Sequence, residues 1–304
     1  MMKSRRRKLS GVTSKYTVAT DLRESSTKTP DFLARSSPLI LDVTHNLAAS
    51  VEYFDMTASK AVLLIVGAWH TPQHYHKLVK QLEANGVRVI CEQLPTNNNV
   101  VPPNTKIEDD VRFIKNMVAK EAAAGTQLTV IGHSWGGIVS SAALAEFAVK
   151  PGSGEGGVVD IVFMCAFIPS EKDSLAGLFG GQLPPYLTSL PNDTIVWTDP
   201  IDHLYNDLPT EEATWAEKTM VAHGHTSQYT SIDCQKVAWR VIPLTYIICE
   251  NDQALPGFVQ EMMIGKVEAE GISVKQYRLP ASHSPFLSMP DRVAEIIGDV
   301  MASR

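Results

Sequence analysis

Short, nearly continuous apolar runs alternate along most of the chain with stretches whose apolar residues recur at helical spacing. The runs are rich in β-branched residues, which is typical of strands that are buried on both faces. They lie at residues 61–66, 87–91, 127–132, 158–169, 242–250 and 272–280. Strands that alternate with helices predict an α/β fold in which helices cover both faces of a mostly parallel sheet.

The helical stretches carry their own start and stop signals. In "HKLVKQLEANG" the leucines and the valine share one face, and Gly86 ends the helix. "IEDDVRFIKNMVAKEAAAG" has acidic residues in its first turn and Gly125 at its end. Further helices are predicted at residues 136–150, 256–270 and 291–303.

The alternation stops between Ser170 and about Arg240. A loop of this length in a compact domain is usually a functional insertion, so we expect a lid at about 170–240 within a domain that spans 58–304. Its apolar side chains either line a substrate pocket or pack the lid onto the core. They are Leu175, Leu178, Phe179, Tyr186, Trp197, Tyr205 and Trp215.

Residues 1–57 differ from the rest of the chain, because they are rich in Ser and Thr and have no sustained periodicity before about Leu39. We expect an N-terminal extension that is disordered in part. The basic cluster "KSRRRK" is not followed by the apolar run of a secretory signal, and acids at Asp21, Glu24 and Asp31 weaken the resemblance to a mitochondrial presequence. We therefore expect a cytoplasmic protein with no membrane segment.

Composition narrows the function classes. The 304 residues are 44% hydrophobic and 20% charged, enough for one large core, and the net charge of -6 argues against a nucleic-acid partner. Four widely spaced cysteines, without a CxxC pair, predict free thiols. The cluster of His70, His74 and His76 has no carboxylate or thiolate at ligand spacing, so we expect neither a metal nor a cofactor.

"GHSWG" is the segment that points to chemistry. Ser134 lies between glycines, directly after a predicted strand and directly before a predicted helix. This is the context of the nucleophile elbow, in which a strained turn exposes the serine hydroxyl at the carboxyl edge of a sheet. The alternative is an ordinary glycine-rich turn. "PGSGEGG" also matches GxGxxG, but it follows a helix and precedes a strand, the reverse of a dinucleotide site.

A nucleophilic serine needs a base and an acid. His283 follows the last predicted strand, which places it at the same sheet edge as Ser134. "CENDQ" ends the preceding strand and offers Glu250, Asn251 and Asp252, of which Asp252 lies furthest into the loop. The order Ser, Asp, His is that of the α/β-hydrolase fold. Ser134, Asp252 and His283 are the predicted triad.

An oxyanion hole needs two backbone amides, one from the residue after the nucleophile and one from the loop after an earlier strand. We expect them from Trp135 and from Ala68, where Gly67 admits a close approach. Trp69 and Trp135 would flank the reacting carbon, although core packing explains tryptophans at these positions equally well. We assign Trp69, Tyr205 and Trp215 to the substrate pocket.

From about Ala61 onward the chain resembles the α/β-hydrolase superfamily, in particular the branch that holds plant methylesterases, hydroxynitrile lyases and many bacterial and fungal hydrolases. The resemblance rests on "GAWHTPQHYHKLVKQLEANGVRVI", "GHSWGG", "LYNDLPTEEATWA", "AWRVIPLTYIICENDQALP" and "SHSPFLSMP". It implies the same triad and the same oxyanion amides of Ala68 and Trp135.

The chain departs from that branch at three positions. Val66 replaces a histidine before the oxyanion loop, and Ser282 replaces a glycine before the catalytic histidine. Hydroxynitrile lyases carry a lysine where this chain has Ser284, so the resemblance favours hydrolysis over lyase chemistry.

We expect a serine hydrolase of a small, mostly apolar carboxylic ester or lactone. The alternatives are a slow ligand-binding protein on a hydrolase scaffold and a non-hydrolytic biosynthetic enzyme. The oligomeric state is open, with a homodimer as one option.

Overall fold

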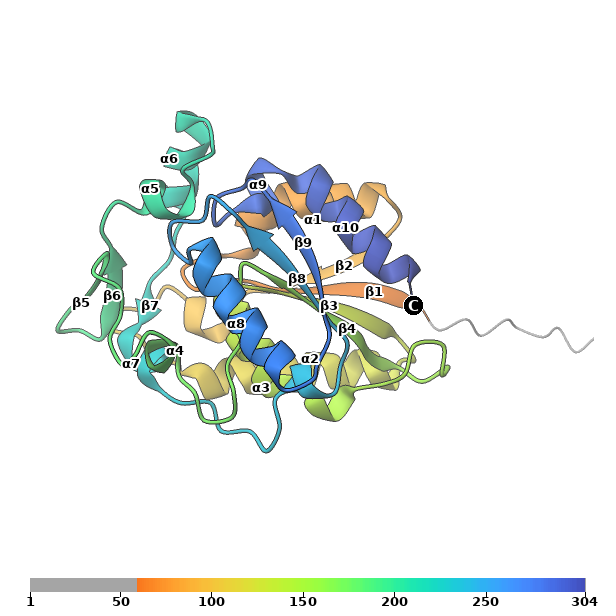
Figure 1. The fold of residues 1–304 in the computed structure, drawn as a ribbon. Helices are drawn as coiled ribbons and strands as arrows, with labels where there is room; N and C mark the ends of the chain where they lie inside the picture. The colour runs from red at the N-terminus through yellow and green to blue at the C-terminus, as the bar shows by residue number, and fades with distance from the viewer. Residues whose placement is uncertain (1–58, 304) are drawn as a thin grey trace, which may run out of the picture. The chain divides into compact units, whose positions relative to one another are not determined.

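The computed structural model describes residues 59–303, so the expectation for residues 1–57 lies outside the described part. Within it, six strands form one sheet in the order β2-β1-β3-β4-β8-β9, and all neighbouring strands are parallel (Figure 1). The strands are β1 (Lys60–Ile65), β2 (Arg88–Cys91), β3 (Gln127–His133), β4 (Gly157–Met164), β8 (Leu244–Cys249) and β9 (Val274–Leu279). The predicted mostly parallel sheet is confirmed.

The burial of the strands explains why their sequences read as continuous apolar runs. Every residue of β3, β4 and β8 is buried, as is all of β1 after Lys60. The two edge strands differ, because β2 has no fully buried residue and β9 has exposed positions along its length. Central strands of a parallel sheet meet helices on both faces and must be apolar on both.

Helices cover the two faces of the sheet (Figure 1). On one face α1 (His76–Ala84) packs against α10 (Pro290–Ala302). On the other lie α2 (Ile107–Ala123) and α3 (Trp135–Ala143), which contact each other, and α8 (Gly257–Ala269). A parallel strand pair needs a crossover connection, so this arrangement follows from the strand and helix alternation in the sequence.

Two predicted elements are too long. The helix after Ser134 ends at Ala143 instead of Lys150, and β4 ends at Met164 instead of residue 169. The apolar run continues beyond β4 because the chain turns at Cys165, with φ 37°, and stays buried. Short helices complete the connections: η1 (Pro72–Tyr75), η2 (Pro95–Asn97), η3 (Ala145–Phe147), η4 (Ala238–Arg240) and α9 (Pro285–Ser288).

Residues 170–240, here called the insertion segment, connect β4 to β8 and lie beyond the carboxyl ends of the sheet strands (Figure 1). Three short strands within it form an antiparallel sheet in the order β5-β6-β7. Its elements are α4 (Leu175–Leu178), β5 (Leu187–Ser189), β6 (Thr194–Trp197), α5 (Pro200–Leu204), α6 (Thr210–Lys218), β7 (His223–Gly224) and α7 (His225–Tyr229). That this segment acts as a lid stays a prediction.

Two further sequence expectations concern the cysteines and the membrane. All four cysteines are free thiols, and Cys165 and Cys249 are buried beneath the carboxyl edge of the sheet. Of the helices within residues 59–303, none combines the length and the apolar character needed to cross a bilayer.

Candidate active site

Ser134 occupies the sharp turn between β3 and α3, with φ 51° and ψ −115°. Residues that carry a side chain rarely adopt this combination of backbone angles, and a residue held there costs about 1–3 kcal/mol of stability. Neighbouring glycines make the turn feasible. A Cβ on Gly132 would lie 2.9 Å from the Gly136 carbonyl oxygen, and a Cβ on Gly136 would overlap the carbonyl oxygen of Ile65. Close backbone approach therefore requires both glycines of the predicted elbow.

His283 and Asp252 come from the loops after β9 and β8, and the structure brings them together. His283 Nδ1 lies 2.6 Å from Asp252 Oδ2, and both side chains are buried. The other carboxylate oxygen, Oδ1, accepts backbone hydrogen bonds from Ala254 at 2.8 Å and Leu255 at 2.7 Å. These amides hold the carboxylate in place, so that it fixes the proton of His283 on Nδ1 and leaves Nε2 unprotonated.

The neighbouring alternatives to Asp252 have other partners. The exposed side chain of Glu250 faces Arg278 at 3.5 Å, and Asn251 donates to the carbonyl oxygen of Pro280 at 3.1 Å. Of the three polar residues that the sequence offers here, Asp252 is the partner of His283.

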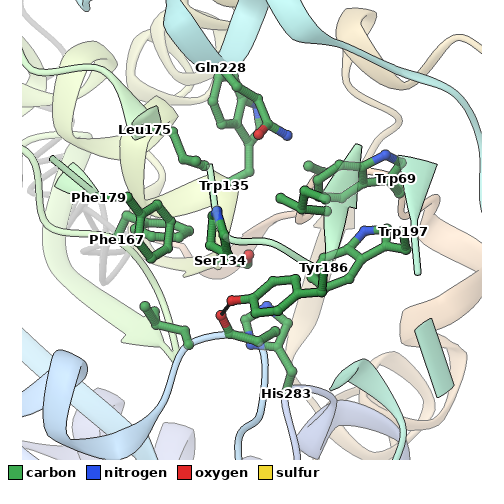
Figure 2. A pocket seen from close by; sticks show the side chains of 15 residues that line it. Trp69, Ser134, Trp135, Phe167, Leu175, Phe179, Tyr186, Trp197, Gln228 and His283 are labelled. Carbon is green, nitrogen blue, oxygen red and sulfur yellow. Dashed lines mark hydrogen bonds between the residues drawn. The ribbon is translucent and has the colours of Figure 1, made fainter. Parts of the chain in front are cut away.

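Ser134 and His283 line one cavity, together with Ala68 and Trp135 (Figure 2). Side chains from the insertion segment complete its wall, so the cavity lies between the carboxyl edge of the sheet and that segment. The remaining lining residues are mostly apolar: Trp69, Phe167, Leu175, Phe179, Pro184, Tyr186, Leu187, Trp197, Gln228, Ala254 and Leu255. A cavity with this lining suits an apolar ligand with few polar groups.

The amides of Ala68 and Trp135 are available to a ligand. Within residues 59–303 neither N–H donates a hydrogen bond to the protein. The Trp135 amide opens α3, where the helix dipole adds partial positive charge. Gly67 is needed before Ala68, because a Cβ there would lie 2.7 Å from His133 Nδ1. Both residues line the cavity together with Ser134, and their role as an oxyanion hole stays a prediction.

A chain of three hydrogen bonds joins the Ala68 loop to the His283 loop. The Gly67 amide donates to Tyr75 Oη at 2.8 Å, and Tyr75 Oη lies 2.7 Å from His133 Nδ1. His133 Nε2 lies 2.9 Å from the carbonyl oxygen of His283. A carbonyl oxygen can only accept, so Nε2 carries the His133 proton and Nδ1 accepts from the Tyr75 hydroxyl. Burial, with His283 and His70 nearby, holds the pKa of His133 well below its usual range.

Asn97 is a second connection that the sequence analysis missed. Its Nδ2 donates to the carbonyl oxygens of Gly67 at 2.9 Å and His70 at 2.8 Å. Its Oδ1 accepts from the Trp69 amide at 3.2 Å and lies 3.2 Å from His223 Nδ1. The Gly67 carbonyl and the Ala68 N–H belong to one peptide unit, so Asn97 fixes the orientation of the Ala68 amide. Its position in a Pro/Asn loop after a strand was the only sequence signal.

Asp110 holds the indole of Trp135, the other predicted oxyanion residue. Its Oδ2 accepts from Trp135 Nε1 at 2.9 Å, and the carboxylate also accepts from the amide and hydroxyl of Thr96. Burial raises the pKa of Asp110 to about 6, although these hydrogen bonds act in the opposite direction. The indole of Trp135 is thereby fixed beside the amide that it contributes.

Of the three residues assigned to the pocket, Trp69 lines the cavity, and it also packs edge-on against Trp197 at 5.2 Å between ring centroids. Tyr205 and Trp215 lie outside the cavity, which corrects the prediction. Tyr205 is fully buried and lies 2.9 Å from His70 Nε2. Trp215 packs against His74 and lines a separate surface depression. Aromatic residues in an insertion can pack toward its base as readily as toward the ligand.

The histidine cluster has protein partners. His70 Nδ1 lies 2.7 Å from the Ala68 carbonyl oxygen, and its Nε2 faces Tyr205. His74 Nδ1 lies at hydrogen-bond distance from the Thr71 carbonyl oxygen, and its Nε2 lies at hydrogen-bond distance from the Ala216 carbonyl oxygen. Both therefore stabilise the loop after β1.

A second group of metal-ligand types includes His283 and two fully buried residues that do not line the cavity, His133 and Cys165; their ligand atoms lie within 4.8 Å of one another. His133 has hydrogen-bond partners at both nitrogens, and burial raises the pKa of the Cys165 thiol well above its usual value. A protonated thiol is a poor metal ligand, so this group fits a metal poorly.

Comparison with known proteins places these features in context. The chain is 30% identical over 242 residues to a protein named alpha/beta hydrolase nvfD from Aspergillus novofumigatus (strain IBT 16806), which covers 78% of this chain and 94% of that protein. A pyrethroid hydrolase from Sphingobium faniae JZ-2 superposes with a TM-score of 0.63 at 23% identity, over 79% of this chain and 96% of that one. An Arabidopsis methylesterase superposes with a TM-score of 0.64 at 18% identity, over 81% and 100%.

The two structural comparisons show a shared fold. Residues 62–296 match the alpha/beta hydrolase family. This chain belongs to that family.

Proposed function

We propose that the protein is a serine hydrolase that cleaves a small, mostly apolar carboxylic ester or lactone through an acyl-enzyme. The observation that carries the proposal is the combination of Ser134 in a strained elbow with a His283 whose Nδ1 faces Asp252, both at one apolar cavity. Because Nδ1 is held by the carboxylate, Nε2 is the nitrogen free to take a proton from Ser134.

In the acylation step Ser134 Oγ attacks the carbonyl carbon of the ester, and its proton passes to His283 Nε2. The carbonyl oxygen becomes an oxyanion that accepts hydrogen bonds from the amides of Ala68 and Trp135. Asp252 stabilises the imidazolium while it exists. Collapse of this intermediate breaks the bond to the leaving alcohol, which takes the proton from Nε2.

Deacylation follows the same route in reverse. Water attacks the acyl-enzyme carbonyl as His283 Nε2 takes one of its protons, and the oxyanion forms again at the same two amides. Breaking the bond to Ser134 releases the acid, and Nε2 returns its proton to Oγ. With a lactone, the alcohol and the acid remain parts of one product. Every proton is carried by His283, so the scheme uses no cofactor.

Turnover of p-nitrophenyl butyrate tests the proposal. Ser134→Ala and Asp252→Asn should each lower kcat by at least about 10³-fold, because each removes a member of a unit that acts together. Ser153→Ala, in the exposed connection after α3, is the control and should match the wild type. Full activity in Ser134→Ala would refute the mechanism. A folded wild type that turns over neither this ester nor a panel of lactones would favour the ligand-binding alternative.

A further inference from the structure

Gln228 is the polar side chain that the mechanism leaves unused. It belongs to α7 in the insertion segment, is fully buried, and lines the same cavity as Ser134 and His283 (Figure 2). Within residues 59–303 neither Nε2 nor Oε1 of its amide has a hydrogen-bond partner. A buried amide without partners is costly, and in native proteins such groups call for a specific explanation.

The other large polar side chains of the cavity are satisfied by the protein, except that of Trp197, whose Nε1 is a lone donor without a partner within residues 59–303. Tyr186 donates its hydroxyl to the Ala254 carbonyl at 2.6 Å, and Trp69 donates Nε1 to the Ile195 carbonyl at 3.0 Å. Trp135 Nε1 is bound by Asp110. Gln228 therefore differs from these neighbours, because it offers a complete donor and acceptor pair to whatever fills the cavity.

The helix that carries Gln228 is anchored on both sides of it. The amide and hydroxyl of Thr226 donate to Asp193 Oδ1 at 3.0 Å and 2.7 Å. Ser227 Oγ donates to the Thr105 carbonyl at 3.3 Å, and beyond the helix the Ile232 amide donates to the Asp173 carbonyl at 2.8 Å. A side chain on a fixed support loses little freedom when it binds a ligand, as suits a residue that selects substrates.

The position of Gln228 indicates which part of a substrate it would meet. The leaving alcohol must receive its proton from His283, so the alcohol part lies on that side of Ser134. Gln228 and His283 lie on opposite sides of Ser134 in Figure 2. Gln228 therefore faces the side that the acyl part occupies.

The chemistry of the amide narrows the group that it binds. Satisfying both Nε2 and Oε1 takes a neutral group that accepts and donates, as a hydroxyl does. A carboxylate would bring its charge against Oε1 in a cavity whose lining holds no Lys or Arg. We propose that Gln228 selects esters whose acyl part carries a hydroxyl group, and that it binds this hydroxyl through both atoms of its amide. The proposal rests on the proposed esterase function and adds a substrate class to it.

A matched series of methyl esters tests the proposed role of Gln228. The series consists of methyl hexanoate and its 3-, 4-, 5- and 6-hydroxy derivatives, and acid release is followed in a pH-stat. At least one hydroxy ester should exceed hexanoate in kcat/KM by about tenfold or more with the wild type. Gln228→Leu should reduce that ratio to near one while hexanoate turnover persists. Gln235→Leu, an exposed glutamine in the same segment, should keep the wild-type ratio.

Thermal unfolding separates recognition from a structural role. Gln228→Leu replaces an unpartnered buried amide with an apolar side chain of similar size, so its Tm should equal or exceed that of the wild type. A lower Tm together with an unchanged ester ratio would assign Gln228 to packing and overturn the proposal. If Gln228→Leu does not fold, Gln228→Asn, which shortens the amide, should lose the same preference.

The failure of the two proposals can be distinguished. Hydrolysis of hexanoate without any preference for a hydroxy ester, or a preference that Gln228→Leu retains, overturns the role of Gln228 alone. Absence of turnover with every ester, and of any effect of Ser134→Ala, overturns the esterase function and this inference with it.

Discussion

His133 donates a hydrogen bond from Nε2 to the backbone carbonyl oxygen of His283 across 2.9 Å. The two residues are 150 positions apart, and the contact ties the elbow strand to the loop that carries the candidate base. Through Tyr75 the same imidazole reaches the amide of Gly67. The base and the oxyanion loop are therefore positioned by one buried chain of hydrogen bonds.

Tyr75→Phe should uncouple these loops. The change leaves the Gly67 amide and His133 Nδ1 buried without partners, which should cost about 1–3 kcal/mol of stability. Tyr75 does not line the cavity, so we expect kcat to fall by about tenfold with little change in KM, in steady-state kinetics with p-nitrophenyl butyrate. Tyr277→Phe on edge strand β9 is the matched control. Wild-type kcat in Tyr75→Phe would mean that the chain has no positioning role.

Asn97→Ala should act on the oxyanion hole without touching substrate. It removes the donor that holds the Gly67 carbonyl, so the Ala68 amide loses its fixed orientation. Because removing an oxyanion donor costs about 10²- to 10³-fold, we expect a smaller loss of about 10- to 100-fold in kcat at nearly constant KM. The neighbouring exposed Asn98→Ala supplies the control. A loss confined to KM would instead place Asn97 in ground-state binding.

The two kinds of site residue differ in how far the sequence can predict them. Ser134, Asp252 and His283 each follow a strand of a parallel sheet, and strand ends of such a sheet meet at one edge, so position along the chain predicted their proximity. Asn97 and Tyr75 make contacts between distant segments, and Gln228 reaches the cavity from the insertion segment. No periodicity or motif records such placements.

Dependence on tertiary packing also explains why two of the sequence-based predictions were wrong. Tyr205 and Trp215 were assigned to the pocket because they are aromatic residues of the insertion segment, but which face of an insertion meets the ligand depends on tertiary packing. The apolar run after β4 resembled strand because the residues beyond Met164 stay buried after the chain turns at Cys165. Apolar character indicates that a segment is buried, whereas the choice between helix and strand must be inferred from periodicity and length.

Stability should fall as the pH is lowered from 8 to 6. Burial lowers the pKa values of His70, His133 and His223, and it lowers that of His223 to about 3. Below pH 6.5 the folded protein therefore binds fewer protons than the unfolded chain. The stabilisation is fully present above the unfolded pKa and is lost as the pH falls. Burial raises the pKa of Asp110 to about 6, and this shift offsets a small part of the loss of stability.

Integrated over this window, the net loss should be about 2 kcal/mol. Urea unfolding at pH 8 and pH 6 measures it. His223→Gln should reduce the pH dependence by about a third. Equal stability of the wild type at the two pH values would contradict the neutral, buried state of these histidines.

Two glycines in helices should respond to alanine with opposite signs. A Cβ on Gly136 would overlap the Ile65 carbonyl oxygen, so Gly136→Ala should destabilise by more than about 2 kcal/mol. Gly298, exposed in α10, has no atom within 4 Å of a Cβ, and Gly298→Ala should stabilise by about 0.5–1 kcal/mol. Chemical denaturation of both variants is the measurement. A neutral Gly136→Ala would show that the elbow does not need this glycine.

Intact mass after incubation with a fluorophosphonate tests the central claim, an activated Ser134, most directly. We predict one covalent adduct on the wild type, no adduct on Ser134→Ala, and slower labelling of Asp252→Asn, in which the carboxylate no longer fixes His283. A folded wild type that stays unlabelled, or an adduct that persists in Ser134→Ala, would contradict the account.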